Sequence, residues 1–434
     1  MKKTLQITIY VLALSVVFQA CSSDSDSSTD SSDNGGSNDM MAPTTYEYYD
    51  ADGNSTVVYS GQVVRNLIIT DIKGLVSSNP SLLVGMYENT EANQGRTITS
   101  GTGSFPAIQS TYGDISGSNL NGKIASTGDG YGIDDCTVAG YGMEPDALVR
   151  AFMDAAFSGA YSADGIDIGQ MLQKSLMGLV SYYQGTSKYL GVVLDQDNTS
   201  PDGDNYYTKM EHYWDESFGY FGASADYLNR TDAEIKSTVY NDSDGDGSID
   251  FLTENCTGLS INAAKRDNGS SNMYDFTGTI MNAYLEGRHL ISTAGSDAEI
   301  EAQRTIIVNN WEKLLAANTI HYINDTVEAI GDGSAWSGTE TAACTVDTTS
   351  PSHQLCKDYA KYWAEMMGFA VGLRYNSFKT ISDADLASVY THMASPVWVG
   401  DEGADVMQFK ADLLAARDIL QAAYDFDADV VAAW

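Results

Sequence analysis

The sequence predicts a mostly α-helical protein, built of antiparallel helical bundles with long loops and little β structure. Apolar residues recur at intervals of three and four over long stretches of the C-terminal half, which is the spacing of one helical face. Only 7 of the 434 residues are proline, and this suits long, uninterrupted helices. No stretch sustains the alternation of period two that a β-sandwich or a β-barrel needs.

The N-terminal residues predict a secretory signal that ends in a lipidation site. Lys2 and Lys3 precede an apolar stretch at residues 7–18, which is too short for a bilayer span of ~20 residues. The letters FQAC then place a small residue directly before Cys21, as in a bacterial lipobox, although Phe and Gln stand where Leu and a small residue are commoner. We expect a signal peptide over residues 1–20 and a lipid on Cys21; ordinary secretion with a chance cysteine is the alternative.

A flexible tether is predicted to follow the lipidated cysteine. Residues 22–38 contain only Ser, Asp, Thr, Asn and Gly, so they offer no side chain that forms a core. We therefore divide the chain into a tether at residues 21–41 and a helical domain at residues 42–434, with two bundle halves that would meet near residues 225–270. The predicted location is a Gram-negative cell envelope, most simply the outer membrane, with the membrane itself as a partner through the anchor.

The charge of the chain excludes whole classes of partner. Asp and Glu number 59 against 23 Lys and Arg, for a net charge of −36. Removal of the signal peptide takes away two lysines and leaves 21 basic residues against 59 acidic ones, a net charge of −38. A nucleic-acid binder is excluded, because contact with phosphates needs basic patches.

The elements of the N-terminal half are predicted from local patterns. They are a short strand at residues 55–59, helices at 64–75, from Pro145 onward and at 168–183, and a long Gly/Ser/Thr/Asp-rich loop at 94–140. Pro145 suits the first turn of a helix, where its missing N–H costs nothing. Gln184-Gly185 is predicted to end the helix at 168–183.

The C-terminal half has the clearest helical periodicity. Its predicted helices lie at residues 280–291, 307–321, 355–373 and 406–424. Seams of this kind pack as antiparallel bundles.

Four cysteines remain after Cys21, and an even number outside the cytoplasm predicts two disulfides. Cys344 and Cys356 enclose a short loop, so we favour that pair, which would stabilise the fold by about 3 kcal/mol in the entropic model. Cys136 and Cys256 are then left to pair with each other. The spacings match no zinc site.

An acidic loop is the most specific motif in the chain. Asp242-Ser243-Asp244-Gly245-Asp246-Gly247-Ser248-Ile249-Asp250 fits the first nine positions of a calcium loop, with Gly247 at the tight bend. Position 12 is Thr253, and the acid falls one residue later. The candidate calcium ligands are Asp242, Asp244, Asp246, Ser248, Asp250 and Glu254. The alternative is a solvated acidic turn.

The segment at residues 206–221 predicts a helix with a second candidate site. Its apolar residues fall on one side, as a core stripe. His212, Asp215 and Glu216 are predicted to lie on the other side. One imidazole and two carboxylates suit part of an iron or zinc site, or an acid–base pair. The alternative is a His–carboxylate pair on a wet face.

This segment also carries a resemblance to a known family. The pattern EHYWDESFGYFG from Glu211 to Gly222, YSGQ from Tyr59 with Arg65, and Gly287-Arg288 resemble the family called domain of unknown function 4856. A match over residues 44–434 would be expected. The resemblance implies an envelope lipoprotein of two helical bundles, organised like the imelysin-like proteins, in a setting related to iron uptake. It implies no established enzyme activity.

The imelysin pattern Gly-x-His-x-x-Glu finds an incomplete counterpart here. Gly287 and His289 fit, but Ser292 stands where the glutamate should be. A carboxylate ligand is therefore missing at His289, and His212 with its two carboxylates is the better candidate for a transition metal.

Three functional hypotheses follow. We expect a non-catalytic envelope lipoprotein with a binding or accessory role in metal acquisition, in which iron rests on the resemblance alone. The first alternative is a metal-dependent hydrolase, such as a peptidase, that uses His212, Asp215 and Glu216. The second is an interaction module that docks an outer-membrane or metal-uptake protein through a surface rich in the 27 tyrosines. No P-loop, H-E-x-x-H, G-x-S-x-G or Rossmann motif is present.

Overall fold

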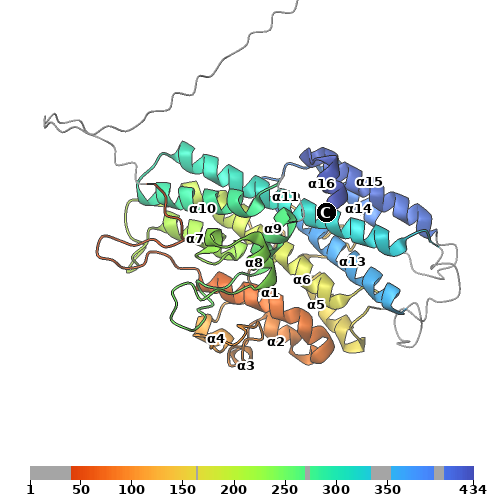
Figure 1. Ribbon diagram of the computed structural model, residues 1–434, viewed down its shortest axis with the longest axis horizontal. Coiled ribbons are helices and arrows are strands. Elements are labelled where there is room, and N and C mark those ends of the chain that lie inside the picture. The colour runs from red at the N-terminus through yellow and green to blue at the C-terminus, as the bar shows by residue number, and fades with distance from the viewer. Residues whose placement is uncertain (1–40, 163–164, 269–273, 334–352, 395–404) are drawn as a thin grey trace, which may run out of the picture. The chain divides into compact units, whose positions relative to one another are not determined.

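A computed structural model describes residues 41–162, 165–268, 274–333, 353–394 and 405–434 (Figure 1). Residues 42–434 form one compact unit, to which the helices on both sides of residues 225–270 belong. The mostly helical prediction is confirmed. Within the described residues no β-strand forms, and isolated bridges are the only β pairing. The strand predicted at residues 55–59 is wrong, since Ser55 alone pairs, in a single bridge with Tyr49.

The helical elements follow one another along the chain. The α-helices are α1 Ser60–Ser78, α2 Leu83–Tyr87, α3 Glu91–Gln94, α4 Tyr112–Ile115, α5 Pro145–Ala155, α6 Ile168–Leu176, α7 Lys209–Phe221, α8 Asp232–Ser237, α9 Gly258–Asn268, α10 Phe276–Ser292, α11 Asp297–Ile330, α13 His353–Gly372, α14 Asp383–Met393, α15 Val406–Tyr424 and α16 Ala428–Ala433. Shorter 3₁₀ turns are η1 Pro80–Leu82, η2 Ala156–Ser158, η5 Val193–Asp195 and η6 Tyr227–Asn229. Two π-helical segments are η3 Met177–Tyr182 and η4 Gln184–Leu190.

The 34-residue helix α11 organises the C-terminal half, where it packs against α10, α13 and α15 (Figure 1). Its predicted seam is confirmed, because Ile307, Trp311 and Leu314 are fully buried. Glu312 is also fully buried, and its carboxylate accepts hydrogen bonds from the Thr380 N–H and the Tyr424 hydroxyl. This buried acceptor ties α11 to the segment before α14 and to the end of α15.

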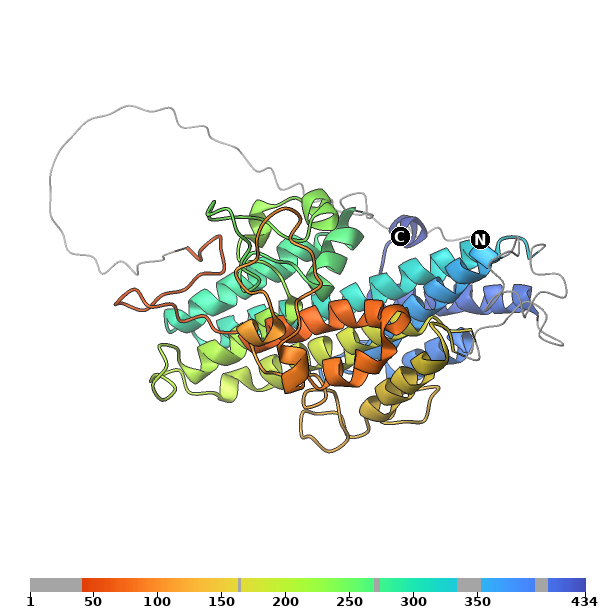
Figure 2. The ribbon, with the colours of Figure 1, turned by 90° about the horizontal axis from the view of Figure 1, so that it is seen from below.

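Helices α1 and α6 lie side by side in the N-terminal half, and α6 also packs against α13 (Figure 2). The continuation of α6 approaches α13 backbone to backbone. A Cβ on Gly178 would lie 2.5 Å from the Cα of Gly372, a separation that real Cβ atoms do not reach. Glycine is required at this crossing because any side chain would push the two helices apart.

The helix that begins at Ile168 does not end at Gln184-Gly185, so that prediction is wrong. It continues as the π-helical segments η3 and η4. Gly185 serves packing instead, since a Cβ there would meet the Trp311 ring at 2.6 Å. A glycine that admits a neighbouring ring and one that ends a helix look alike in sequence.

In the described part of the chain, no helix combines the length and the apolarity that crossing a bilayer requires.

Candidate functional site

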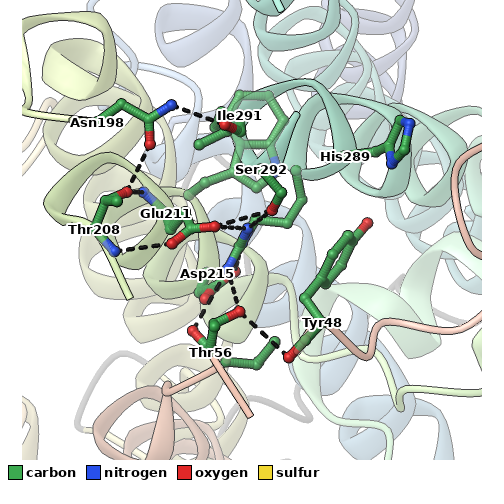
Figure 3. A network of polar contacts seen from close by, with 12 residues as sticks. Tyr48, Thr56, Asn198, Thr208, Glu211, Asp215, His289, Ile291 and Ser292 are labelled. Atoms are coloured by element: carbon green, nitrogen blue, oxygen red, sulfur yellow. Dashed lines mark hydrogen bonds and ion pairs between the residues drawn. The ribbon is translucent and has the colours of Figure 1, made fainter. Parts of the chain in front are cut away.

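A buried ion-pair network joins α7 to α10 (Figure 3). Arg288 on α10 has no exposed surface. Its Nε donates to Asp215 Oδ1 at 2.8 Å, and its Nη1 donates to Glu211 Oε1 at 2.6 Å. Its Nη2 donates to the Thr56 hydroxyl at 2.9 Å, and its guanidinium lies 4.8 Å from the centre of the Tyr48 ring. One cation thus holds two carboxylates of the motif and the segment before α1.

Both charges of the Arg288–Asp215 pair persist at neutral pH. Burial raises the pKa of the Asp215 carboxyl to about 6, although Arg288 and the Tyr46 hydroxyl oppose the shift. Burial alone would lower the pKa of the Arg288 guanidinium, but Asp215 and Glu211 outweigh that effect and raise it. At pH 7 the network therefore contains one cation and the ionised Asp215. Tyr46 donates a further hydrogen bond to Asp215 Oδ1 at 2.8 Å.

Glu211 serves the helix start and the network at once. In a capping box, the Thr208 hydroxyl accepts from the Glu211 N–H, and Glu211 Oε2 accepts from the Thr208 N–H at 2.8 Å. Its other oxygen binds Arg288. Asn198 extends the arrangement, because its amide donates to the Ile291 carbonyl and its oxygen accepts from the Thr208 hydroxyl (Figure 3). The beginning of α7 is therefore attached to the end of α10 at several points.

Glycines in the resembling motifs make room for this packing. A Cβ on Gly287 would lie 2.0 Å from the Trp214 ring. A Cβ on Gly219 would lie 2.7 Å from the Cβ of Tyr59 and 2.8 Å from that of Gln62. The three motifs that carry the family resemblance are thus three parts of one packed unit, in which α7 lies against both α1 and α10.

The structure does not bring His212, Asp215 and Glu216 together as metal ligands. Asp215 is fully buried and faces Arg288, so its predicted place beside His212 is wrong. The His212 ring stacks on Tyr207, and its Nε2 lies 3.8 Å from a Glu216 oxygen. Glu216 Oε1 accepts from the Gln62 amide at 2.8 Å. What remains is the His–carboxylate pair that the sequence allowed as the alternative.

The second histidine candidate also lies outside the network. His289 points away from the ion pairs in Figure 3. Ser292, which stands where the imelysin pattern has glutamate, contacts Arg288 Nη1 and donates to Glu211 Oε1 at 2.9 Å. The carboxylate at this place in space comes from Glu211 on α7, and it binds an arginine.

Three of the six predicted calcium ligands gather. Asp242, Asp244 and Asp246 each offer a carboxylate oxygen, and these atoms lie within 4.8 Å of one another. Gly247 adopts a φ of +84° at the tight bend, as predicted. Ser248 donates its hydroxyl hydrogen bond to Asp246 at 2.6 Å.

Asp250 and Glu254 brace the loop from outside that group. Asp250 Oδ1 accepts from the Gln109 amide at 2.8 Å. Glu254 is buried, and its two oxygens accept from the Ser243 N–H at 2.6 Å and the Asp250 N–H at 2.9 Å. Both carboxylates thus lie outside the group of three, Glu254 bound by backbone N–H groups of the loop and Asp250 by the Gln109 amide. Their part as calcium ligands stays a prediction.

The predicted Cys136–Cys256 disulfide does not form. Both are buried free thiols, and they lie in different surroundings. The Cys136 carbonyl accepts from the Tyr375 hydroxyl, whereas the Cys256 thiol donates to the Ser224 hydroxyl at 3.4 Å. Burial raises the pKa of the Cys136 thiol to about 12, which keeps it unreactive. Cys344 lies outside the described residues, so the Cys344–Cys356 bridge stays a prediction, as do the signal peptide and the lipid on Cys21.

Comparison with known protein families finds a match, and it covers the region that contains most of the motifs described above. Residues 154–343 match the family model named Domain of unknown function (DUF4856). The resemblance to that family is thereby confirmed, over a narrower range than residues 44–434. The match includes the motif from Glu211 to Gly222 and Gly287-Arg288, but not the YSGQ motif. No curated protein and no solved structure matches the chain, and the imelysin-like organisation stays a prediction.

Sequence reasoning missed a pair of lysines, Lys123 and Lys188, that meet beside a cavity. The first lies in the predicted loop and the second beyond the predicted end of a helix, so no local pattern connects them. The scarcity of basic residues in so acidic a chain was the available signal.

Proposed function

We propose that the protein is a non-catalytic binding lipoprotein of the bacterial cell envelope. In this proposal a lipid on Cys21 attaches it to a membrane, most simply the outer membrane, and residues 22–41 hold the helical domain away from the surface. Its role is accessory to metal acquisition. The iron-related setting is supported by the family resemblance, and the strongly acidic surface supports an environment rich in cations.

The observation that carries the non-catalytic part is the use of the motif carboxylates. Of the two acids that the hydrolase alternative takes from α7, Asp215 binds the buried Arg288, and Glu216 accepts a hydrogen bond from the Gln62 amide. Asp215 is fully buried, with one oxygen paired to the guanidinium and the other enclosed without a partner, so it does not open onto a site where a catalytic metal could meet a substrate. The motif therefore supports the packing of the domain.

We further propose that a structural calcium ion binds the loop at Asp242, Asp244 and Asp246. None of the three forms an ion pair with a basic side chain in the described residues. Their converging carboxylates repel one another, and a bound cation would relieve that repulsion. A cavity of about 420 Å³ beside the loop is also lined by Asp226. Asp226 is 6% exposed, and its Oδ1 has no hydrogen-bond partner there. A hard cation with oxygen ligands satisfies these groups.

Metal analysis by mass spectrometry on the dialysed full chain tests this proposal. We expect about one calcium per chain, lost in the Asp242→Asn/Asp244→Asn double variant. Asp202→Asn/Asp204→Asn is the matched control, because both residues are exposed on another acidic loop. Calcium that is absent from the wild type, or retained by the first variant, would contradict the calcium site. Stoichiometric iron or zinc that is lost in His212→Ala/Glu216→Ala would favour the hydrolase.

The anchor is tested separately in cells. We expect a labelled fatty acid to be incorporated into the wild type and not into Cys21→Ser, and the variant to leave the membrane fraction. A wild-type chain without label would overturn the lipoprotein assignment.

A further inference from the structure

Two lysines stand together without a carboxylate partner on the outer side of α7. Lys188 lies on η4 and Lys123 on the loop after α4. Their ammonium groups lie 5.2 Å and 6.0 Å from the centre of the same Tyr189 ring. Neither forms an ion pair with any residue that the structure describes. In a chain with 59 acidic and 23 basic residues, two neighbouring cations left unpaired call for an explanation.

The surroundings make this pair electrostatically unfavourable in the absence of an anion. Burial lowers the pKa of the Lys123 ammonium, and Lys188 and Arg65 lower it further, to about 8. Arg65 is 5% exposed, and its Nε donates to the Asn119 carbonyl at 2.7 Å. Glu216 opposes the shift but does not cancel it. An anion beside Lys123 and Lys188 would relieve the repulsion among three cations.

A cavity offers room for that anion. Lys188 lines a cavity of about 670 Å³, together with Tyr131, Asn121 and Gln184. This volume is within the range of small-molecule sites. The Lys188 ammonium lies 5.3 Å from the centre of the Tyr131 ring, so two aromatic rings lie close to this cation, one of them on the cavity wall.

Two amide oxygens at the cavity lack hydrogen-bond donors. Gln184 is 3% exposed, and its amide nitrogen donates to the Lys123 carbonyl at 2.7 Å, which directs its oxygen elsewhere. That oxygen and the side-chain oxygen of Asn121 are both buried and have no partner in the described structure. Buried acceptors of this kind cost free energy unless a donor reaches them. A ligand with N–H or O–H groups would supply the donors.

The acids on the remaining wall are already engaged. Three carboxylates line it. Glu144 accepts from the Thr127 hydroxyl at 2.5 Å, and Asp146 accepts from Tyr87 at 2.9 Å and pairs with Arg150 at 2.9 Å. Asp129 accepts from the Tyr183 hydroxyl and from the Tyr131 N–H. These carboxylates do not neutralise Lys188, but they repel a multiply charged anion. The cavity therefore selects a ligand with a single negative charge.

We propose that this cavity binds a small carboxylate that carries amino or hydroxyl groups, the class of amino acids and hydroxy acids. The carboxylate pairs with Lys188, beside Lys123, and the N–H or O–H groups donate to Gln184 Oε1 and Asn121 Oδ1. This assignment rests on the proposed binding function and names its ligand class.

The family motif borders this cavity region. The Tyr213 ring on α7 contacts the Tyr189 ring edge to face at 5.5 Å. Gln184, Lys188 and Tyr189 all belong to the π-helical η4, which packs against α7. π-helical turns are rare, and they often occur at functional sites because they redirect side chains from the regular helical positions. The side of α7 that pairs with Arg288 through Glu211 and Asp215 thus fixes the helix in place. The side that carries Tyr213 then faces the proposed ligand site.

Ligand binding by the full chain tests the proposal. Each of the twenty amino acids, lactate and gluconate is added singly at millimolar concentration, and the melting temperature is measured; the best probe is then titrated by calorimetry. We expect at least one probe to bind, and its carboxamide to bind at least about tenfold more weakly, since a charge-assisted contact is lost. Lys188→Met should weaken binding by a similar factor, and Lys188→Arg should retain most of it. Lys379→Met is the control, since Lys379 pairs with Asp383 and does not line the cavity, and it should leave binding unchanged.

Three results would overturn the assignment. They are no stabilisation by any probe, equal binding of acid and amide, or unchanged binding by a folded Lys188→Met variant. If Lys188→Met fails to fold, Gln184→Met replaces it and should weaken the binding of the same probe. Calcium content is measured on the same samples, so a cavity without a ligand is distinguished from a failure of the metal-binding part of the proposed function.

Discussion

Charged groups are paired on one side of helix α7 and unpaired on the other. The inner side faces Arg288, and the outer side faces Lys123 and Lys188. On the inner side, the Arg288 guanidinium has carboxylate oxygens of Asp215 and Glu211 within 3 Å and is fully buried. On the outer side, Lys123 and Lys188 share one aromatic ring and pair with no carboxylate of the described residues. The comparison distinguishes charged groups that stabilise the fold from charged groups that are free to bind a ligand. Removing one partner of a buried ion pair strongly destabilises the fold. For unpaired cations beside a cavity, the binding of an anion lowers the free energy instead.

The largest expected effect is the loss of the inner cation. Arg288→Met would leave two carboxylates without their partner, one of them fully buried. We expect the free energy of unfolding to fall by ~3–5 kcal/mol, measured by urea denaturation. Arg304→Met is the control, because Arg304 pairs with the more exposed Glu301 on one helix; it should cost less than about 1 kcal/mol. Equal losses in the two variants would erase the distinction between the sides of α7.

A smaller loss is expected from a single methyl group at the packing contact of the same side. Gly287→Ala would place a Cβ 2.0 Å from the Trp214 ring, and we expect overpacking to cost about 1–3 kcal/mol. Gly74 on α1 is the matched control, since a Cβ there meets nothing within 4 Å. Gly74→Ala should stabilise the protein by roughly 0.5–1 kcal/mol through helix propensity. If thermal denaturation shows both variants shifting in the same direction, this packing argument fails.

The smallest expected effect is a pH dependence on the outer side. The pKa of Lys123 is about 8 in the folded protein, and the ordinary value is 10.5. Between these values the unfolded chain binds more protons than the folded one, so stability from this group rises as the pH rises through that window. Lys123→Met should remove this rise and be relatively more stable near pH 7. Because Lys123 is only half-buried, solvent screening keeps the effect modest.

Urea denaturation at pH 7.5 and pH 10 measures the difference. Lys188, Arg65 and Glu216 are the charged groups that act on Lys123, and all three remain in the variant. Lys379→Met serves as control. A wild-type stability that falls over this interval, with the same fall in Lys123→Met, would contradict the assigned repulsion.

Local patterns predicted the helices well and their partners poorly. The seam at Ile307, Trp311 and Leu314 is visible in the sequence because burial repeats with the helical period. A spacing of three residues predicts Asp215 beside His212, but the position of Asp215 is decided by Arg288, 73 residues away. No local pattern announces a partner at that distance.

Similar reasoning explains the other differences. An even count of cysteines predicts pairs, but it does not reveal that Cys136 contacts Tyr375 and Cys256 contacts Ser224. Gln184-Gly185 predicts a helix end, although the Trp311 ring occupies the place where a side chain of residue 185 would lie. The gathering of Asp242, Asp244 and Asp246 is visible in the sequence because the three lie within five consecutive residues. Glu254 lies further along, and its oxygens accept from backbone N–H groups of the loop.

The two interactions of the Glu211 carboxylate, with Thr208 and with Arg288, also bear on how the domain assembles. One carboxylate oxygen closes the first turn of α7, and the other receives the guanidinium of a helix that is made later in the chain. The local signal for starting a helix and the long-range signal for docking it are therefore delivered by one side chain. An aspartate at position 211, which is one methylene shorter, would reach either the Thr208 N–H or Arg288 but not both. The formation of the first turn of α7 and its packing against α10 are therefore coupled. A shift in register that breaks one of the two contacts also weakens the other.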